Sequence, residues 1–569
     1  MRGVMRSIAL AIVCALVPSC AGGPSGSSAP AAESTSSGGE SITNVQEQGV
    51  DEGGIVKMHG EHLVVLRRGR LFSVDLAGGS MRQISVTNAY APGHHAADWY
   101  DELLIHGDTI VVIGFSYRDS ATEIGLFEID ARGLIVHRGS FQLRSNDYFS
   151  SRNYASRLVG DRLVLYVPHY LGYVQGDGSF DRSFPGLRAV GGAWSSIDGP
   201  VHASLAPRDG YAVLHTVVMC ELGERDALGC RAQGMVGPVG RTFYVSRDAV
   251  YVWISDAPRA EEGGVPTDAM VYRLPLDGGP TGAVRAWGAP TDQLSFKEAD
   301  DGRLHVLVRS EGHGDAMWAP EQRAGALALA SIPLGAFTSE GRALDVATYR
   351  AMPQVDGIGA ITNRFVGDWV LYGTGNAWGW GQARGGSVYA ASWRHGGPAY
   401  RVDVGHDVER IEAMGRGAVV VGRENEGLAF SSIALDGGVQ PVDRYVLRNA
   451  SQGETRTHGF FYRDDGEGQG VLGLPVRGGN ESGWHQLWHG SASVFFLRVN
   501  GQRFTPLGGL ASGDAHIDDH CVASCADWYG NARPIFWRGR VFALLGYELV
   551  EGRVIADRVE ESARLVLRP

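Results

Sequence analysis

Short strand-like runs follow turn residues at intervals along the whole chain. In each copy a turn containing Gly or Asp precedes a run of β-branched and other apolar residues, as at 60–65, 107–112 and 160–165. Further copies begin at Arg247, Asp301, Gly367, Gly415, Gly459 and Arg538. Gly and Asp tolerate the tight turn of a hairpin, and β-branched residues favour the strand that follows. The pattern therefore predicts an all-β protein made of repeated hairpins.

The spacing of these copies predicts a β-propeller. Most copies are about 50 residues apart, which fits one four-stranded antiparallel blade with its loops. Nine copies are present, and in a closed propeller the first and last segments often complete one blade together. We therefore predict eight blades, with seven as the alternative if the degenerate copy at Gly459 is not a blade. The longer interval between Gly160 and Arg247 holds a Gly- and aromatic-rich stretch, 170–200, that predicts an inserted loop.

The most specific pattern lies just before the first hairpin. TNVQ at 43–46 is followed by GVDE at 49–52 and IVK at 55–57. This pattern resembles the opening signature of the secreted "beta propeller domain" family, distant relatives of WD40 proteins in bacteria and archaea. Segments 244–251 and 457–462 are similar to later parts of the same family. The resemblance implies a propeller fold outside the cytoplasm, and it implies no particular activity or ligand.

The first twenty residues predict export and lipidation. Arg2 and Arg6 precede an apolar run at 8–17 that is too short to span a bilayer as a helix. The run ends in LVPSC, which resembles a bacterial lipobox with Cys20 as the acylated residue. The alternative is ordinary signal-peptidase cleavage near Ala21. Because Asp does not follow Cys20, lipidation in a Gram-negative cell would place the protein at the outer membrane.

Composition divides the chain into three parts. Residues 1–19 are the predicted signal peptide, and 20–42 form a Gly-, Ser- and Ala-rich tether that has too few apolar residues to fold. Residues 43–569 are the predicted propeller. The formal charge of -12 becomes -14 once Arg2 and Arg6 are removed, which argues against nucleic acid as a partner. Lys57 and Lys297 are the only lysines, which indicates a GC-rich genome rather than a functional choice.

Four cysteines remain once Cys14 leaves with the signal peptide and Cys20 is set aside as the lipid site, and an exported location favours disulfides between them. Proximity in the sequence favours the pairs Cys220–Cys230 and Cys521–Cys525. The alternative for the second pair is a zinc site, because cysteines separated by three residues lie near potential co-ligands. Those weaker candidates for metal binding are His516, Asp518 and His520.

The chain contains no recognised catalytic motif, neither a nucleophile elbow nor a P-loop nor a zinc-protease helix. We therefore expect a membrane-anchored binding or scaffold module for a protein or a glycan, without a cofactor. Trp378 and Trp380 lie in a Gly-rich stretch and are candidates for stacking on such a ligand. The alternative is a hydrolase or lyase whose acid and base lie on loops at the mouth of the propeller channel.

Overall fold

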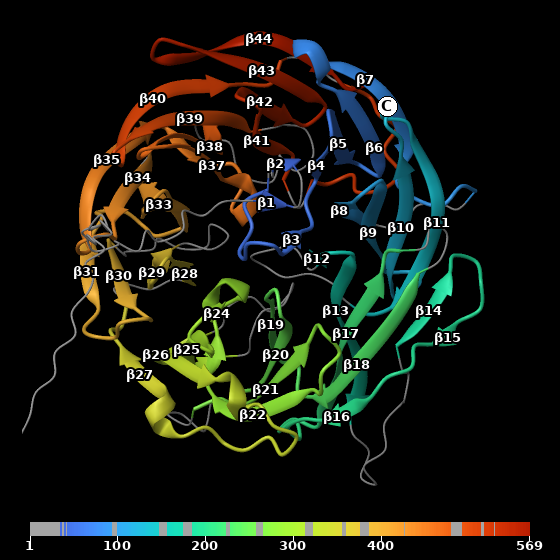
Figure 1. Ribbon diagram of the computed structural model, residues 1–569, viewed down its shortest axis with the longest axis vertical. Helices are drawn as coiled ribbons and strands as arrows, with labels where there is room; N and C mark the ends of the chain where they lie inside the picture. Colours follow the sequence, from blue (N-terminus) through green and yellow to red (C-terminus); the bar gives the residue numbers. More distant parts are fainter. Residues whose placement is uncertain are drawn as a thin grey trace, which may run out of the picture. The chain divides into compact units, whose positions relative to one another are not determined.

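The computed structural model describes most of the chain after residue 42. The described residues are 35–36, 39–40 and 43–569, apart from 94–98, 147–155, 174–184, 224–227, 258–265, 313–322, 356–359, 376–385, 426, 479–491, 514–516 and 528–529. Residues Ala32–Pro569 form one compact unit. Within this unit nine sheets of at least four strands follow one another around a ring, which we number as blades 1 to 9 (Figure 1).

The blades use the strands in chain order. Blade 1 contains β4 (Val56–His59), β5 (His62–Arg67), β6 (Arg70–Asp75) and β7 (Arg82–Asn88). Blade 2 contains β8 (Trp99–His106), β9 (Thr109–Ser116), β10 (Ala121–Ile129) and β11 (Ile135–Arg144). Blade 3 contains β12 (Ser156–Val159), β13 (Arg162–Tyr173), β17 (Tyr211–Glu221) and β18 (Gly229–Gly237). Blade 4 contains β19 (Gly240–Val245), β20 (Ala249–Asp256), β21 (Asp268–Pro275) and β22 (Gly282–Trp287).

The second half of the ring repeats this plan. Blade 5 contains β23 (Ala289–Pro290), β24 (Phe296–Glu298), β25 (Arg303–Gly312), β26 (Arg323–Pro333) and β27 (Tyr349–Met352). Blade 6 contains β28 (Ala360–Val366), β29 (Trp369–Gly375), β30 (Ser387–Ser392) and β31 (Tyr400–Asp403). Blade 7 contains β32 (Arg410–Met414), β33 (Gly417–Glu424), β34 (Gly427–Ala434) and β35 (Gln440–Arg448). Blade 8 contains β36 (Ala450–Gln452), β37 (Phe461–Gly466), β38 (Gln469–Gly478), β39 (Ser493–Asn500) and β40 (Arg503–Leu510). Blade 9 contains β41 (Ala532–Trp537), β42 (Arg540–Leu545), β43 (Glu548–Ile555) and β44 (Arg558–Val566).

Helical structure in the described residues is limited to short 3-10 turns. These are η1 (Ala77–Gly79), η3 (Gln293–Ser295), η4 (Leu334–Ala336), η5 (Val346–Thr348) and η6 (Thr457–Gly459).

The prediction of eight blades, with seven as the alternative, is wrong. The turn in each predicted copy joins the first long strand of a blade to the second, except that the turn of blade 8 lies at 466–468 rather than at Gly459. Nine copies therefore correspond to nine blades. The prediction reduced nine copies to eight blades because it assumed that the two ends of the chain share one sheet. In the structure, blade 1 and blade 9 each contain four strands of their own.

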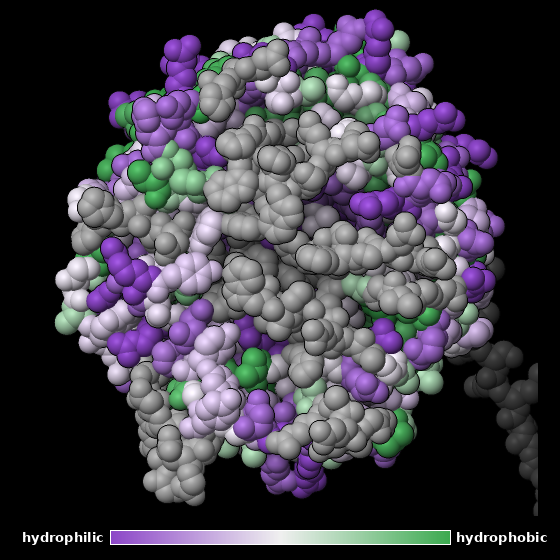
Figure 2. Space-filling model, turned by 180° about the vertical axis from the view of Figure 1, so that it is seen from behind, coloured by the Kyte–Doolittle hydropathy of each residue, from purple (hydrophilic) through white to green (hydrophobic). Residues whose placement is uncertain are grey.

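Burial follows the position of a strand within its blade. The middle strands are rich in apolar residues and largely buried, and in β9 every residue from Ile110 to Ser116 is buried. Both faces of such a strand are covered by neighbouring blades, so a continuous apolar run forms instead of an alternating one. The outer strands alternate, as in β11, where exposed and buried residues are interspersed. On the face shown in Figure 2, hydrophilic residues predominate around the periphery among the coloured residues, and hydrophobic ones form small separate groups.

The ring closes by packing between blade 1 and blade 9. One apolar cluster joins Val65 and Phe72 of blade 1 to Phe542 and Leu549 of blade 9. At the outer edge, the side chain of Gln83 exchanges two hydrogen bonds with the main chain of Arg568, at 2.8 and 2.9 Å. Side-chain packing thus replaces a shared strand as the closure.

The segment 186–203, which overlaps the end of the predicted insertion at 170–200, adds strands to two blades. β14 (Gly186–Ala189) and β15 (Ser195–Ser196) extend the outer edge of blade 2 beyond β11. β16 (Val201–Ala203) then pairs in parallel with β18 at the outer edge of blade 3. The insertion therefore makes blades 2 and 3 wider than their neighbours and supplies one wall of the pocket described below.

Candidate functional site

The segment that carries the family resemblance lies in the middle of the ring. We call residues 43–57 the signature segment. Its strand β3 (Asp51–Glu52) pairs antiparallel with β12, the innermost strand of blade 3 (Figure 1). The side chain of Asn44 donates to Glu412 of blade 7 at 3.1 Å, and Arg364 of blade 6 donates to the carbonyl of Val45 at 3.2 Å. The segment thus connects inner strands that are far apart in the sequence.

Both lysines of the chain hold this segment. The ammonium group of Lys57 is buried and donates to Thr43 Oγ1 at 2.9 Å, Asp51 Oδ1 at 2.6 Å and the carbonyl of Glu52 at 2.7 Å. Lys297, on β24 of blade 5, pairs with the carboxylate of Glu47 at 2.9 Å. Their positions show that each lysine has a structural role in fixing the signature segment, in addition to any effect of genome composition.

A buried carboxylate is the centre of the polar groups around the segment. Glu52 accepts hydrogen bonds from the main chain of Gln46 and from His458 Nε2, both at 2.8 Å, and lies 4.0 Å from Arg157 Nε. Burial alone raises the pKa of Glu52, but the charge of Arg157 and the hydrogen bond from His458 outweigh it and lower the pKa. Burial lowers the pKa of His458 to about 4, so its imidazole is neutral at pH 7. Glu52, His458 and Arg157 therefore interact with one another, and their role is to stabilise the signature segment.

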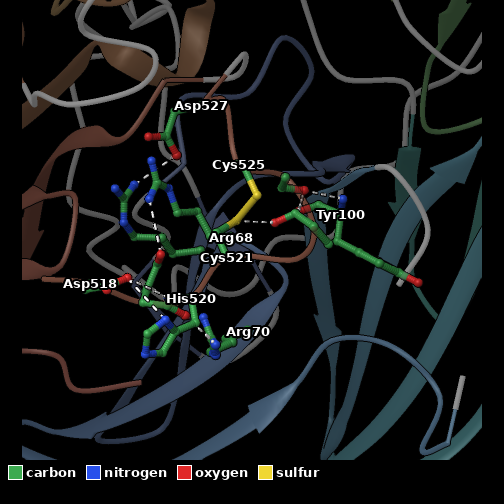
Figure 3. Close-up of a disulfide and its surroundings, with 12 residues drawn as sticks. Arg68, Arg70, Tyr100, Asp518, His520, Cys521, Cys525 and Asp527 are labelled. Carbon is green, nitrogen blue, oxygen red and sulfur yellow. Dashed lines mark hydrogen bonds and ion pairs between the residues drawn. A yellow bond between two sulfur atoms is a disulfide. The ribbon is translucent and has the colours of Figure 1, made fainter. Parts of the chain in front are cut away.

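The second disulfide fixes a loop that precedes the last blade. Cys521 and Cys525 are bonded, and the loop 517–527 lies against blades 1 and 2 (Figure 3). The hydroxyl of Ser524 accepts from the main-chain N–H of Tyr100 at 2.6 Å and donates to its carbonyl at 3.2 Å. Arg67, at the end of β5, donates to Asp527 at 2.9 Å. Two side-chain anchors therefore hold the loop, Ser524 between the two cysteines and Asp527 just after them.

Asp519 forms a third anchor beneath the tip of the loop. Arg68 Nη1 donates to its carboxylate at 3.2 Å, Arg70 donates to its carbonyl at 2.7 Å, and the hydroxyl of Tyr547 also donates to the carboxylate. Burial raises the pKa of Asp519, but the hydrogen bond from Tyr547 and the charge of Arg68 outweigh it, so the pKa is lowered. Asp519 is therefore a stable anion that keeps the loop in place.

A carboxyl with a raised pKa lies behind this loop. Asp101 is 8% exposed, and burial, followed by the nearby charges of Glu102 and Asp527, raises its pKa to about 7. It lines a cavity of about 20 Å³ together with Arg67 and Ser524. A cavity of this size has room for about one water molecule. Asp101 can exchange a proton near neutral pH, but this cavity is too small for a substrate.

A larger polar pocket lies on the other side of Tyr100. It has a volume of about 160 Å³ and lies within blade 2, with Glu123 on β10, Gln142 on β11 and Arg188 on β14 among its lining residues. Gln142 donates to Glu123 at 2.7 Å and accepts from Arg188 Nε at 2.7 Å, and the hydroxyl of Tyr100 also donates to Glu123. Figure 3 shows the ring of Tyr100 extending away from the disulfide, so one residue connects the loop to the pocket.

Some of the site residues predicted from the sequence are described by the structure, and others are not. Both predicted disulfides are present, and Cys220 and Cys230 face each other across β17 and β18. Trp378, Trp380 and His516 lie outside the described residues, as does Cys20.

The two described metal candidates lie at the surface. The side chains of Asp518 and His520 are 75% and 88% exposed and 3.4 Å apart. Within the part of the chain that the structure describes, no group of three or more potential metal ligands was found. The disulfide uses both sulfur atoms that the zinc alternative requires.

The polar pocket was not predicted from the sequence. Glu123 lies in ATEIGLF and Gln142 in SFQLR, and in both strands the polar residue interrupts apolar ones. A buried polar side chain in a strand needs partners, so such an interruption is a signal of a polar site. The partner Arg188 comes from the insertion, and nothing in the sequence indicates that the insertion returns to the edge of blade 2.

Comparison with known proteins shows to which family the chain belongs. The family model described as "Beta propeller domain" matches residues 40–326, which include the signature segment and blades 1 to 4. The chain belongs to the beta propeller domain family. A comparison with curated proteins finds no significant match. Among the described residues of this beta propeller domain protein, no helix is long and apolar enough to cross a membrane.

Several solved structures match the chain at very low sequence identity and low TM-score. Apo AztD from Citrobacter koseri is 7% identical, with 89% of this chain and 94% of that chain covered and a TM-score of 0.34. A structure described as the eukaryotic initiation factor is 11% identical, with 76% and 94% covered and a TM-score of 0.32. A mutant of Synechocystis apocarotenoid oxygenase is 11% identical, with 63% and 97% covered and a TM-score of 0.25. Similarities this distant carry no information about what this propeller binds.

Proposed function

We propose that this β-propeller is a binding module that presents the disulfide-closed loop to a protein partner. The observation that supports this proposal is the combination of a firmly anchored base and an exposed tip. The side chain of His520 is 88% exposed, and Val522, between the two cysteines, is 63% exposed. Beneath them Asp519 and Ser524 are buried and bonded to blades 1 and 2. A loop fixed before binding loses little conformational entropy on binding.

The main chain of the loop supports the same interpretation. His520 and Ser524 have positive φ angles of 44° and 51°, a region that residues other than Gly rarely adopt. Such conformations persist where the surrounding structure fixes them, and they are common at binding sites. An apolar Val522 beside polar His520 and Asp518 also matches the usual composition of a small protein contact, with an apolar centre and a polar rim.

Site-specific photo-crosslinking in the producing cell tests this proposal. A photoreactive amino acid at Val522 is compared with the same amino acid at Val346, which is 77% exposed on η5 of blade 5. We expect a discrete protein adduct from position 522 that is missing from position 346. The adduct should also disappear when Cys521 and Cys525 are both replaced by Ser. The absence of a protein adduct at 522, or identical adducts at both positions, would contradict the proposal.

The alternative, a hydrolase or lyase, has one supporting feature. Asp101 has a pKa of about 7, which suits general acid–base chemistry. Its cavity of about 20 Å³ is too small to admit a substrate unless the loop 517–527 moves away. Because three anchors and a disulfide hold that loop, we favour the binding module.

We also propose that Cys20 is lipidated and that the protein is an extracytoplasmic lipoprotein of the cell envelope. The support is the lipobox-like sequence before Cys20 and the presence of two disulfides, which form in oxidising compartments. The Cys20→Ser variant should be lost from the membrane fraction and should no longer incorporate radiolabelled palmitate. Retention of the variant in the membrane fraction with unchanged processing would contradict lipidation.

A further inference from the structure

The polar pocket of blade 2 has the features of a small-ligand site. Its volume of about 160 Å³ is eight times that of the cavity beside Asp101, and it is partly open to solvent. An engineered cavity of about 150 Å³ accepts a molecule with one six-membered ring. The pocket is therefore large enough for one ring, and it is too small for a folded peptide segment.

The polar groups of the pocket are connected and already oriented. Glu123 is 8% exposed and Gln142 is 2% exposed, and they are joined by the 2.7 Å hydrogen bond described above. Gln142 Nε2 also donates to the carboxylate of Asp119 at 3.3 Å, and Arg188 Nη2 lies 3.8 Å from the same carboxylate. The guanidinium of Arg188 is stacked 4.3 Å from the ring centre of Trp194, which limits its movement. These contacts hold both donors and acceptors at fixed positions around the pocket.

The charges that line the pocket balance. Arg118 and Arg188 oppose Asp119 and Glu123, and Gln142 is neutral. Burial raises the pKa of Asp119, but the charge of Arg118 and the hydrogen bond from Gln142 outweigh it, so Asp119 remains an anion at pH 7. A lining with equal numbers of both charges does not select a strongly charged ligand. It suits hydroxyl groups, because each hydroxyl both donates and accepts hydrogen bonds.

Two tyrosines add an apolar surface to this polar lining. The rings of Tyr90 and Tyr100 lie with their centres 6.0 Å apart, and both line the pocket. A sugar ring has a C–H face that packs on an aromatic ring and an edge of hydroxyls that bind carboxylates, amides and guanidinium groups. From the volume, the balanced charge and the aromatic wall, we propose that the pocket of blade 2 binds one neutral hexopyranose unit of a glycan.

Binding of methyl glycosides to the full-length protein tests the pocket. The probes are the methyl glycosides of D-glucose, D-galactose and N-acetyl-D-glucosamine, with D-glucuronate and L-arginine as charged comparisons, measured by ligand-observed NMR and calorimetry. We expect at least one neutral glycoside to bind with a Kd of about 1 mM or tighter, which is a free energy of about -4 kcal/mol. The charged probes should bind at least tenfold more weakly.

Matched variants assign the binding to this pocket. Val190 lines the pocket, so Val190→Trp should fill it and abolish binding. Val136→Trp places the same side chain on β11 at a residue that is 50% exposed, and it should leave binding unchanged. Glu123→Gln keeps the shape and removes one carboxylate, so it should weaken binding at least tenfold. Thermal unfolding shows whether each variant folds. If Val190→Trp does not fold, the effect of Glu123→Gln on binding decides whether the glycoside binds in this pocket.

Two results would overturn the proposal. One is that no neutral glycoside binds, or that a charged probe binds better than every glycoside. The other is glycoside binding that survives both Val190→Trp and Glu123→Gln in folded protein. This proposal does not depend on the crosslinking result at Val522, because the pocket and the tip of the loop are different surfaces.

Discussion

At the scale of single residues, Lys57 shows why one of the two lysines remains in a chain whose other basic side chains, apart from histidine, are arginines. Its three N–H bonds point to three acceptors, the side chain of Thr43, the carboxylate of Asp51 and the carbonyl of Glu52. An ammonium group directs its three donors tetrahedrally, whereas a guanidinium group is planar and larger. The geometry around Lys57 therefore excludes arginine.

The variant Lys57→Arg should lower the free energy of unfolding by about 2 kcal/mol, because it overfills a buried site and loses at least one hydrogen bond. The control is Lys297→Arg. Lys297 is 30% exposed and meets both oxygens of Glu47, a geometry that a guanidinium also suits, so the change should be below about 0.5 kcal/mol. Chemical denaturation measures both variants, and equal effects would contradict the argument.

Asp101 gives a second prediction at this scale. Its folded-state pKa of about 7 is higher than the value of about 3.9 expected in the unfolded chain. The folded protein therefore holds this proton more tightly, and ionisation of Asp101 destabilises the fold as the pH rises through 7. The variant Asp101→Asn cannot ionise, so it should be more stable than the wild type by about 2–4 kcal/mol at pH 8.5 and by only about 1 kcal/mol at pH 4.5. Chemical denaturation of both proteins at the two pH values measures this difference in the free energy of unfolding. A difference that does not depend on pH would show that Asp101 is ionised in the folded protein at both values.

At the scale of the element, the loop 517–527 connects a disulfide to a strand of another blade. Cys521 and Cys525 close a short loop, so their bond removes little chain entropy from the unfolded state. Its main effect is to hold Ser524 against the main chain of Tyr100 on β8. The disulfide is therefore expected to affect local order more than global stability.

The double variant Cys521→Ser and Cys525→Ser should lose less than about 2 kcal/mol of stability. Hydrogen exchange of the Tyr100 amide should become faster, because this N–H bonds to Ser524. The control is the double variant Cys220→Ser and Cys230→Ser in blade 3, which should leave exchange at Tyr100 unchanged. If exchange at Tyr100 stays slow in the first variant, the anchors at Asp519 and Asp527 are sufficient to hold the loop.

The strands and loops also show which parts of the fold and of the site could be predicted from the sequence. Eight of the nine turns could be predicted because a hairpin needs only local residues, whereas the turn of blade 8 lies after Gly466 and not at the predicted Gly459. The number of blades was predicted wrongly, because closure depends on an apolar cluster that includes Phe72 and Phe542, which are far apart in the chain. The pocket was missed for the same reason, since Glu123, Gln142 and Arg188 meet only after β14 joins β11. The two disulfides could be predicted because each pair is close in sequence.

At the scale of the whole molecule, buried neutral histidines should make the propeller sensitive to acid. Burial is the largest cause of the lowered pKa of His215, to about 3, and of His406 and His458, to about 4. These residues lie on β17, before β32 and in η6, so the effect is distributed around the ring. Because an unfolded histidine has a pKa of about 6.5, the unfolded chain binds more protons than the folded one between pH 4 and 6.5.

Stability should therefore fall as the pH decreases from about 6.5 to 4.5, since the three histidines become charged only on unfolding. Each histidine with a lowered pKa changes the free energy of unfolding by about 1.4 kcal/mol per pH unit in this range. The raised pKa of Asp101 has the opposite effect and cancels the contribution of one histidine. His458→Gln should make the dependence on pH less steep, whereas His520→Gln, at the exposed tip of the loop, should leave it unchanged. Urea denaturation at several pH values gives the slope, and a flat profile would show that other groups compensate.

The signature segment also affects what a sequence search can find. Its residues contact one another and the inner strands, as with Asn44 and Glu412 or Glu47 and Tyr244, while the tip of the loop and the pocket of blade 2 use other residues. A search keyed on TNVQ, GVDE and IVK therefore gathers proteins that share the same closed ring, whatever those proteins recognise. Grouping such proteins by shared ligand requires comparison of the residues equivalent to Val522, Glu123 and Arg188 instead.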